Sequence, residues 1–414
     1  MYIERALENK IKSYLKRKEI IAIVGARQCG KTTMMKHMFS SLKNARFISF
    51  DDQKILQLFE GDIDLFIKSY IEDIDILFID EFQYAEDGGK KLKYIYDSKP
   101  IKIIISGSSA AELSIQSIKY LVGRIFVFTL FPFSFEEFLH YKSPKLNAFM
   151  KEKKILSPPA VESTKKYYEE YLTFGGYPSV VLAQSTEEKI EILKNIYNTY
   201  LLREIREILQ ISEDTKLVKL MKLLALQIGK EVNYNELSLN TLFKYHELIK
   251  YLAILKKTFV CLESRPYFTN KRKELVKMPK LYFLDTGFRN MILDNFQEPE
   301  KRTDLGALNE NFTASEITKK DLRLNYWRTK AGAEVDFILE KESRLIPIEV
   351  KTLLKQPKFG RSFVNFVEEY KPEEGMILSQ DYSHNTKINK TKVMFRPVFM
   401  IPYLIELILK KKSK

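Results

Sequence analysis

The stretch IIAIVGARQCGKTTMMKHMF, residues 20–39, decides the fold of the first part of the chain. Its apolar start, Ile20–Val24, predicts a buried strand, and Thr33–Phe39 predicts a helix. Between them, Gly25–Thr32 fits the spacing G-x-x-x-x-G-K-[ST] without a mismatch. In this spacing, glycines let successive backbone N–H groups face phosphates, and the start of the helix adds positive potential. The stretch therefore predicts a phosphate-binding loop rather than a glycine turn that happens to contain a lysine.

The chemistry of this loop predicts nucleotide phosphates and Mg²⁺ as ligands. Lys31 is expected to reach the β- and γ-phosphates, where it acts in catalysis, and the Thr32 hydroxyl to coordinate Mg²⁺. Cys29 is expected to be a small filler whose backbone faces phosphate, rather than a redox switch. The expected nucleotide contacts are Gly25, Arg27, Gln28, Cys29, Gly30, Lys31, Thr32 and Thr33.

A second apolar run, Ile76–Ile79, ends in two acids, Asp80 and Glu81. We expect Asp80 to hold Mg²⁺ through water and Glu81 to orient and deprotonate the attacking water. Adjacent carboxylates also occur where a strand runs out into solvent. Their combination with the phosphate-binding loop favours the catalytic interpretation.

Two further residues have both a functional and a structural interpretation. Ser108 follows the apolar run Ile101–Ile105, at a strand end where open α/β sheets bind ligands, and is a candidate γ-phosphate sensor or part of a plain Gly-Ser turn. Arg124 precedes the apolar run Ile125–Thr129. It is a candidate arginine finger that reaches the nucleotide of a neighbouring subunit in a homo-oligomer, or an ordinary surface arginine.

Apolar runs alternate with helical stretches over the first 140 residues, which predicts an α/β fold with a parallel sheet. The five candidate strands are Ile20–Val24, Arg46–Phe50, Ile74–Ile79, Ile101–Ile105 and Ile125–Thr129. Further on, Lys216–Gly229, Asn235–Leu239 and Thr241–Leu255 predict three helices. Strands are expected to follow at Thr258–Leu262 and Lys280–Leu284. Three helices and a β-hairpin are the order of a winged-helix domain, and the last 110 residues return to a mixed α/β pattern.

Composition restricts the class of protein. The chain has 414 residues, of which 45% are hydrophobic and 29% charged, so it is globular and long enough for two or three domains. Its two cysteines exclude a disulfide scaffold and a four-cysteine zinc site. No continuous apolar segment is long enough for a signal peptide or a membrane span, which predicts a cytoplasmic protein with no membrane contact. The net charge of +14 favours a polyanionic partner such as nucleic acid, although a lysine-rich composition explains it equally well.

These motifs resemble those of prokaryotic AAA-type ATPases that carry a C-terminal domain of unknown function. The resemblance rests on the phosphate-binding loop and on Asp80–Gln83, Ser106–Ser109, Leu121–Arg124, Gly175–Pro178 and Pro279–Gly287. It covers nearly the whole chain and implies an ATPase that uses ATP and Mg²⁺. It also implies four parts: an AAA-type core (1–142), a helical lid (143–214), a winged helix (215–295) and a domain similar to restriction endonucleases (296–414).

A second group of charged residues lies near the C-terminus. Residues 333–339 and 344–351 predict a hairpin in which Asp336, Glu349 and Lys351 can converge. An acid followed by Glu-x-Lys resembles the pattern of PD-(D/E)xK nucleases, although Val335 replaces its usual proline. The resemblance implies that Asp336 and Glu349 bind Mg²⁺ or Mn²⁺, that Lys351 positions the attacking water, and that Glu310 is the additional helix acid. An alternating charged hairpin without activity is the other interpretation.

The segment Lys256–Lys280 has eight basic and two acidic residues and covers the predicted winged-helix hairpin. Such a cluster is typical of DNA-backbone contacts, and Lys244 and Lys250 on the preceding helix could approach a groove. A solvated loop facing a protein partner is the alternative. The sequence thus predicts an ATPase that binds DNA, with the nuclease-like domain as a candidate for cleaving it. The alternative is a nucleotide-switched regulatory or assembly protein whose nuclease-like domain only binds.

Overall fold

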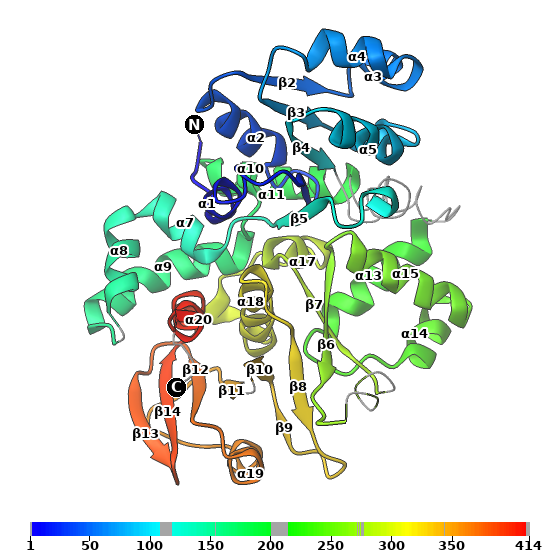
Figure 1. Cartoon of the computed structure of the whole chain (residues 1–414). Coiled ribbons are helices and arrows are strands. Elements are labelled where there is room, and N and C mark those ends of the chain that lie inside the picture. Colours follow the sequence, from blue (N-terminus) through cyan, green and yellow to red (C-terminus); the bar gives the residue numbers. More distant parts are fainter. Residues whose placement is uncertain are drawn as a thin grey trace. The chain divides into compact units, whose positions relative to one another are not determined.

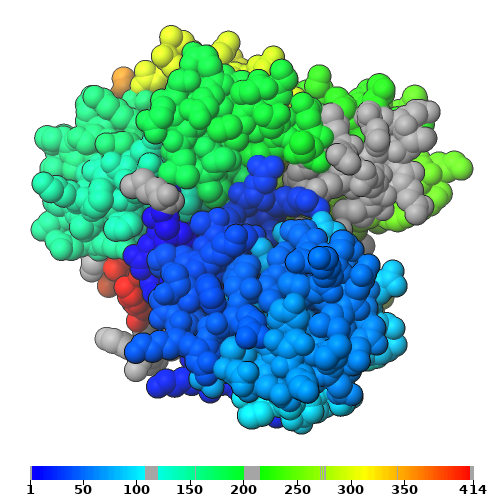
Figure 2. Space-filling view, turned by 90° about the horizontal axis from the view of Figure 1, so that it is seen from above, coloured from blue at the N-terminus to red at the C-terminus, as the bar shows by residue number. Residues whose placement is uncertain are grey.

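The computed structural model describes the chain except residues 1, 108–117, 154, 200–213, 271, 273, 275–276, 343 and 411–414. It divides into two compact units (Figure 1). The first unit comprises Met1–Phe133 and Lys257–Phe259, and the second comprises Ser134–Lys256 and Val260–Lys414. Most of the first unit is the blue to cyan surface in Figure 2.

The first unit is built on a five-stranded sheet in the order β2-β3-β4-β1-β5, and every pair in it is parallel. This confirms the predicted parallel α/β fold. Each of the five predicted strands is present, with its ends within two residues of the prediction. The strands are β1 (Ile20–Gly25), β2 (Ala45–Ser49), β3 (Ile76–Asp80), β4 (Lys102–Gly107) and β5 (Ile125–Leu130).

Helices cover both faces of this sheet because β1 is apolar on both. Ile20, Ala22 and Val24 face one core, which is completed by three helices, and Ile21 and Ile23 face another, which is completed by two. The first set is α3 (Gln53–Gly61), α4 (Ile63–Tyr70) and α5 (Gly88–Ser98), and the second is α1 (Ala6–Lys12) and α2 (Lys31–Ser40). The short 3₁₀ turns η1 (Phe82–Tyr84) and η2 (Ile118–Leu121) lie in the same unit.

The second unit begins with helices: α7 (Phe135–Lys142), α8 (Pro144–Glu152), α9 (Pro158–Phe174), α10 (Pro178–Leu182), α11 (Thr186–Ile196), α13 (Asp214–Leu226), α14 (Tyr234–Thr241) and α15 (Tyr245–Lys257). Side chains from Tyr177 to Ile292 share one hydrophobic core. The predicted lid and winged-helix segments therefore pack together, and the boundary drawn between them at residue 214 remains a prediction.

A four-stranded sheet, β7-β6-β8-β9, follows these helices. The hairpin partners β6 (Cys261–Pro266) and β7 (Lys280–Phe283) are antiparallel, β6 is parallel to β8 (Asn325–Arg328), and β8 is antiparallel to β9 (Glu334–Val335). Three helices and a hairpin thus occur in the predicted order. However, α15 starts four residues and β6 three residues later than predicted, because Leu242 (φ 60°) and Phe259 (φ 61°) adopt left-handed backbone conformations that interrupt both elements.

The C-terminal part contains a second five-stranded sheet in the order β10-β11-β12-β14-β13. Its strands are β10 (Phe337–Lys341), β11 (Arg344–Val350), β12 (Glu374–Ser379), β13 (His384–Ile388) and β14 (Thr391–Pro397). The remaining helices are α17 (Thr286–Ile292), η4 (Pro299–Lys301), α18 (Leu305–Lys319), α19 (Arg361–Tyr370), η5 (Val398–Met400) and α20 (Ile401–Lys410). Strands β10 and β11 form the predicted antiparallel hairpin, and β11 runs parallel to β12.

The single tryptophan and both cysteines of the chain lie in hydrophobic cores. Trp327 is a core anchor, 4% exposed, and its ring lies 5.4 Å from the ring of Phe366. Cys29 and Cys261 are buried free thiols. Within the described part of the chain, no helix has both the length and the apolar character needed to cross a bilayer.

Candidate functional site

The phosphate-binding loop connects β1 to α2. Gly25 is required at its start, because a Cβ there would lie 2.0 Å from the backbone oxygen of Leu130. Gly30, with φ 93°, turns the chain into α2 and leaves the N-terminus of that helix without a side-chain cap. Lys31 is 7% exposed, and its Nζ donates hydrogen bonds to the backbone oxygens of Gly25 (3.1 Å) and Ala26 (3.0 Å). The ammonium group is therefore held within the loop beside an uncapped helix start, an arrangement suited to an anion.

The other predicted contacts lie around the same turn. Gln28 is exposed with φ 59°, and Arg27 and Thr32 are half-buried. Thr33 is exposed on the first turn of α2. Cys29 is fully buried, and its Sγ donates to the backbone oxygen of Leu130 (3.3 Å), which agrees with a filler rather than a reactive thiol.

Arg5 supports the loop from outside, a role that the sequence did not indicate. Its side chain is 4% exposed. Nη1 donates to the backbone oxygen of Cys29 (2.9 Å), and Nη2 donates to that of Phe131 (2.6 Å) just after β5. The guanidinium also lies 4.6 Å from the ring centre of Phe133. No motif surrounds this arginine, and its partners are far along the chain.

The predicted acids lie at the same edge of the sheet as the loop. Val24 of β1 pairs with Gly107 of β4, and Ile79 of β3 pairs with Ile105, so the carboxyl ends of three adjacent parallel strands lie together. Asp80, 4% exposed, ends β3. Its carboxylate is therefore beside the turn that follows β1.

Ser106 connects the two acids. Its hydroxyl donates to Asp80 Oδ1 and accepts from the backbone N–H of Glu81 (3.3 Å). Glu81 has φ 53°, and its Oε2 accepts a hydrogen bond from Gln83. Ser106 thus occupies a position near the one predicted for Ser108, which lies outside the described residues.

Arg124 lies at the amino ends of the strands, whereas the loop lies at their carboxyl ends. Its backbone oxygen accepts from the N–H of Ile20, at the start of β1, whereas the loop follows the end of β1. Five residues of strand separate these points by about 16 Å. The guanidinium pairs with Asp97 (Nε to Oδ1, 3.1 Å). Arg124 is therefore positioned away from the loop of its own chain.

The C-terminal candidate residues form a second cluster. Asp336, between β9 and β10, accepts a hydrogen bond from the backbone N–H of Val350 (2.7 Å). Removal from water, followed by the neighbouring charge of Glu310, raises the pKa of Asp336 to about 8, and Glu349 adds to the effect. Glu349, 4% exposed, accepts from Lys351 (2.5 Å), while its buried Oε2 has no hydrogen-bond partner. The structure thus brings Asp336, Glu349, Lys351 and Glu310 into one neighbourhood.

Lys280 of β7 belongs to this cluster, which the sequence did not indicate. Its side chain is 1% exposed and forms ion pairs with Glu334 and with Glu310 (Nζ to Oε1, 3.5 Å). Tyr282 also donates to Glu310. Among the described residues, no three His, Cys, Asp or Glu side chains are grouped closely enough to hold a metal ion. The acids therefore do not form a ready divalent-metal site in this arrangement, although the unpartnered Glu349 oxygen is a suitable ligand atom.

The two glycine-containing motifs at Gly175–Pro178 and Pro279–Gly287 meet in a buried junction. Asp285 accepts hydrogen bonds from the N–H groups of Gly176 (2.7 Å) and Phe288 (2.9 Å). A Cβ on Gly287 would lie 2.0 Å from the backbone oxygen of Phe174. These motifs therefore fix the end of α9 to the start of α17.

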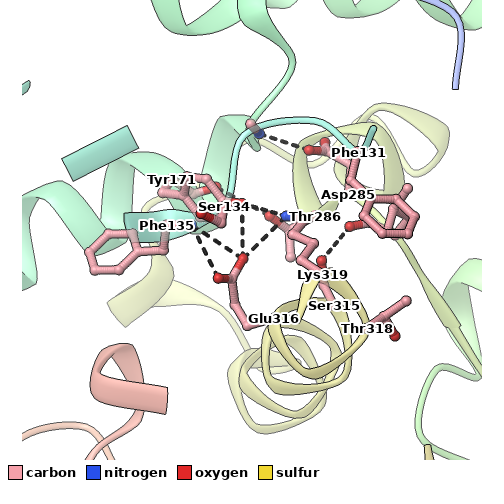
Figure 3. Close-up of polar contacts among 12 residues, drawn as sticks. Phe131, Ser134, Phe135, Tyr171, Asp285, Thr286, Ser315, Glu316, Thr318 and Lys319 are labelled. Atoms are coloured by element: carbon pink, nitrogen blue, oxygen red, sulfur yellow. Dashed lines mark hydrogen bonds and ion pairs between the residues drawn. The ribbon is translucent and has the colours of Figure 1, made fainter. Parts of the chain in front are cut away.

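Next to this junction, the buried carboxylate of Glu316 accepts from the N–H of Phe135, from Tyr171 and from Lys319 (Figure 3). Its contacts join α7, α9 and α18. In these contacts, the carboxylates of Asp285 and Glu316 hold helices together.

The basic segment is less available for phosphate than predicted. Lys256 and Arg265 both pair with Glu263, and Lys280 is buried. Lys271 and Lys273 lie outside the described residues. The exposed basic residues in and near the segment are Lys244, Lys250, Lys257, Arg272 and Lys277. Apolar side chains are exposed on α14 (Leu239, 78%), just after it (Leu242, 73%) and at the start of α15 (Tyr245, 52%).

Similarity to known proteins identifies three domains along the chain, and the first of them covers most of the parallel-sheet unit. Residues 17–139 match an AAA domain, and residues 165–299 and 305–398 match two domains of unknown function. An uncharacterized protein of Haemophilus influenzae is 24% identical over 413 residues, covering 95% of this chain and 96% of that protein. An uncharacterized protein of Methanocaldococcus jannaschii is 24% identical over 338 residues, covering 79% and 73% respectively.

Solved structures are more distant. A Walker-type ATPase of Pyrococcus abyssi is similar over 70% of this chain and 96% of its own, at 16% identity and a TM-score of 0.47. The Orc1 protein of Aeropyrum pernix, solved in complex with DNA, is similar over 71% and 93%, at 10% identity and a TM-score of 0.31. From the matched domains and the parallel sheet, the chain carries an AAA-type P-loop ATPase domain followed by two domains of unknown function.

Proposed function

We propose that this protein binds Mg–ATP and hydrolyses it at the carboxyl edge of the first sheet. The observation that carries the proposal is that the loop after β1 lies at the same end of the parallel sheet as Asp80, the last residue of β3, and Glu81, with β4 between the two strands. The donor set also fits: a threonine hydroxyl and a buried carboxylate are oxygen ligands of the kind that Mg²⁺ prefers. When bound, the ion would neutralise charge on the β- and γ-phosphate oxygens.

Each residue then has a distinct task. The loop N–H groups and Lys31 hold the phosphates, and Thr32 and Asp80 hold the metal. Ser106 fixes the Asp80 carboxylate through its hydroxyl. Glu81, held by Gln83, accepts the proton of the attacking water. Removing this base should slow hydrolysis without weakening the phosphate contacts.

The test is Glu81→Gln. We expect ATP turnover to fall by about a hundredfold, within the range for loss of a general base, while the Kd for a fluorescent ATP analogue changes less than threefold. Lys31→Ala should weaken binding itself. The exposed Glu86→Gln, five residues further on, is the matched control and should behave as wild type. Unchanged turnover in Glu81→Gln would exclude this residue as the base.

The position of Arg124 supports a role only in trans. Since it lies at the edge of the sheet opposite the loop, we infer that any contact with nucleotide is made to a second copy of the chain, in a homo-oligomer. Mixing Arg124→Ala with Lys31→Ala protein should then restore turnover at mixed interfaces. If the mixture hydrolyses ATP no faster than its two components, Arg124 makes only its ion pair with Asp97 and has no role in turnover.

A second function, DNA binding with metal-dependent cleavage, is favoured by one observation: Asp336, Glu349 and Lys351 converge, and a buried Glu349 oxygen has no partner. Asp336 and Glu349 would hold Mg²⁺ or Mn²⁺, and Lys351 would position water. The exposed Lys244, just before α15, and Lys250, on α15, would contact the DNA backbone. This function would join the ATPase unit to a cleaving domain in one chain.

The decisive measurement is cleavage of plasmid and single-stranded DNA with Mg²⁺ or Mn²⁺, with and without ATP, against Asp336→Ala. Cleavage that this variant abolishes would support the function, and its dependence on ATP would reveal coupling. Intact ATP turnover without cleavage would instead favour a nucleotide-switched regulatory or assembly protein whose C-terminal domain only binds. DNA binding itself should weaken as salt rises, because lysine–phosphate contacts release counterions.

A further inference from the structure

One buried lysine occupies the place of a cation among the C-terminal carboxylates. Lys280 is 1% exposed, and its ammonium group bonds Glu334 and lies 3.5 Å from Glu310 Oε1. It also lies 5.2 Å from the ring centre of Tyr326. A charged ammonium is expensive to bury unless opposite charges surround it. Glu310 and Glu334 therefore compensate the buried charge of Lys280, and Lys280 compensates theirs.

The geometry of Glu310 keeps this arrangement in place. Glu310 Oε1 also accepts a hydrogen bond from Tyr282, two residues after Lys280 on β7. Its other oxygen faces Gly229, where a Cβ would lie 2.9 Å away, so only a glycine with φ 76° allows this close approach. The carboxylate of Glu310 thus points at β7, toward Lys280 and Tyr282.

A divalent ion would need the same oxygen atoms. Mg²⁺ and Mn²⁺ take carboxylate oxygens in direct coordination, whereas here the Glu310 and Glu334 oxygens are used by an ammonium group that would also repel the ion. Among the described residues, no three potential ligands are grouped for a metal. Among the described carboxylates of this cluster, Glu349, which pairs with Lys351 through Oε1, has a buried Oε2 without a hydrogen-bond partner.

We propose that Lys280 is a built-in cation that closes the Asp336 cluster to divalent metal ions, and that the cluster takes such an ion only when β7 withdraws this lysine. The proposal rests on the second function above, a metal-dependent site at Asp336 and Glu349. Strand β7 leads directly into Asp285 and Gly287, which fix α17 to the end of α9. The lysine is therefore tied to the helical part of the unit, whose movement would open the cluster.

The test is Mn²⁺ binding by the nucleotide-free full chain, counted by electron paramagnetic resonance. Wild type and Asp336→Asn should bind the same number of ions. Lys280→Met should bind one ion more than wild type, and Asp336→Asn in that background should remove it. Mn²⁺ should also raise the melting temperature of Lys280→Met but not that of wild type.

The matched control is Lys319→Met, which removes another buried lysine from a carboxylate, Glu316, in the same unit. It should lose stability without gaining an ion. If Lys280→Met does not fold, Lys280→Gln, which keeps a hydrogen-bond donor toward Glu334, takes its place. The proposal would be overturned if Asp336→Asn bound one Mn²⁺ fewer than wild type. It would also be overturned if a folded Lys280 variant bound no more Mn²⁺ than wild type. Absence of DNA cleavage in every variant, with the extra ion present, would overturn the nuclease function alone.

Discussion

Asp304 illustrates how a single charged side chain contributes to the stability of the second unit. Its carboxylate accepts hydrogen bonds from Arg302 (2.8 and 2.9 Å) and from Arg289 (2.6 Å). Removal from water raises the pKa of Asp304, but these bonds outweigh that effect and lower it to about 2. The carboxylate thus stabilises the fold above its unfolded pKa near 4, and this contribution disappears as the pH falls through 2.

We therefore expect Asp304→Asn to lower the free energy of unfolding by about 2 kcal/mol at pH 7. The difference from wild type should shrink steadily between pH 4 and pH 2. Urea unfolding across this range measures it, with the exposed Asp294→Asn as control. A pH-independent difference would mean that the charge of Asp304 is not the cause.

Arg5 makes a different prediction, because its effect is on the phosphate-binding loop. Arg5→Lys keeps the charge, but a single ammonium cannot bridge the backbone oxygens of Cys29 and Phe131 as the guanidinium does. We expect ATP-analogue affinity to fall about tenfold, or about 1.4 kcal/mol, measured by fluorescence titration. The exposed Arg17→Lys should leave affinity unchanged. Wild-type affinity in Arg5→Lys would show that the loop keeps its shape without this bridge.

Among whole elements, α9 and α17 approach each other closely at their junction. A Cβ on Gly287 would meet the Phe174 backbone oxygen at 2.0 Å, so Gly287→Ala must displace one helix from the other. We expect a loss of about 3 kcal/mol or more. Gly61→Ala, in α3, has no atom within 4 Å of the new Cβ and should change stability by less than about 1 kcal/mol. Chemical denaturation measures the free energy of unfolding of both variants. Equal values would mean that the two helices can move apart at the junction without loss of stability.

The elements differ in how far the sequence predicts them. Strands β1 and β4 are buried on both faces. The sequence of β1 is an unbroken apolar run and that of β4 is interrupted by Lys102 and Ser106, so their positions could be predicted to within two residues. The starts of α15 and β6 could not, because Leu242 and Phe259 adopt left-handed conformations that nothing in their residue type indicates.

In the candidate sites, residues that lie next to a recognisable strand could be predicted, and residues whose partners are far along the chain could not. Asp80 and Glu81 could be predicted because their spacing from a strand is local. Arg5 and Lys280 could not, because their partners lie 126 and 54 residues away along the chain. Tertiary structure alone brings these side chains to the sites.

The chain as a whole is not divided into units at a single point. It passes from the first unit to the second after Phe133, returns for Lys257–Phe259, and leaves again at Val260. Within the first unit, Phe259 packs against both hydrophobic cores, and its ring lies 5.8 Å from that of Phe131. Phe259, from the middle of the second unit's sequence, therefore adds to the hydrophobic packing of the ATPase unit.

This arrangement predicts which unit a mutation will destabilise. In the full chain, Phe259→Ala should lower the melting transition that ATP analogues raise, by about 5 °C or more, because it removes a partly buried ring from the nucleotide-binding unit. Leu252→Ala, only seven residues earlier but in the core of the second unit, should lower the other transition. Differential scanning calorimetry with and without an ATP analogue separates the two. If Phe259→Ala lowered only the transition that ATP analogues do not affect, then Lys257–Phe259 would stabilise the second unit instead, and the ATPase unit would be complete at Phe133.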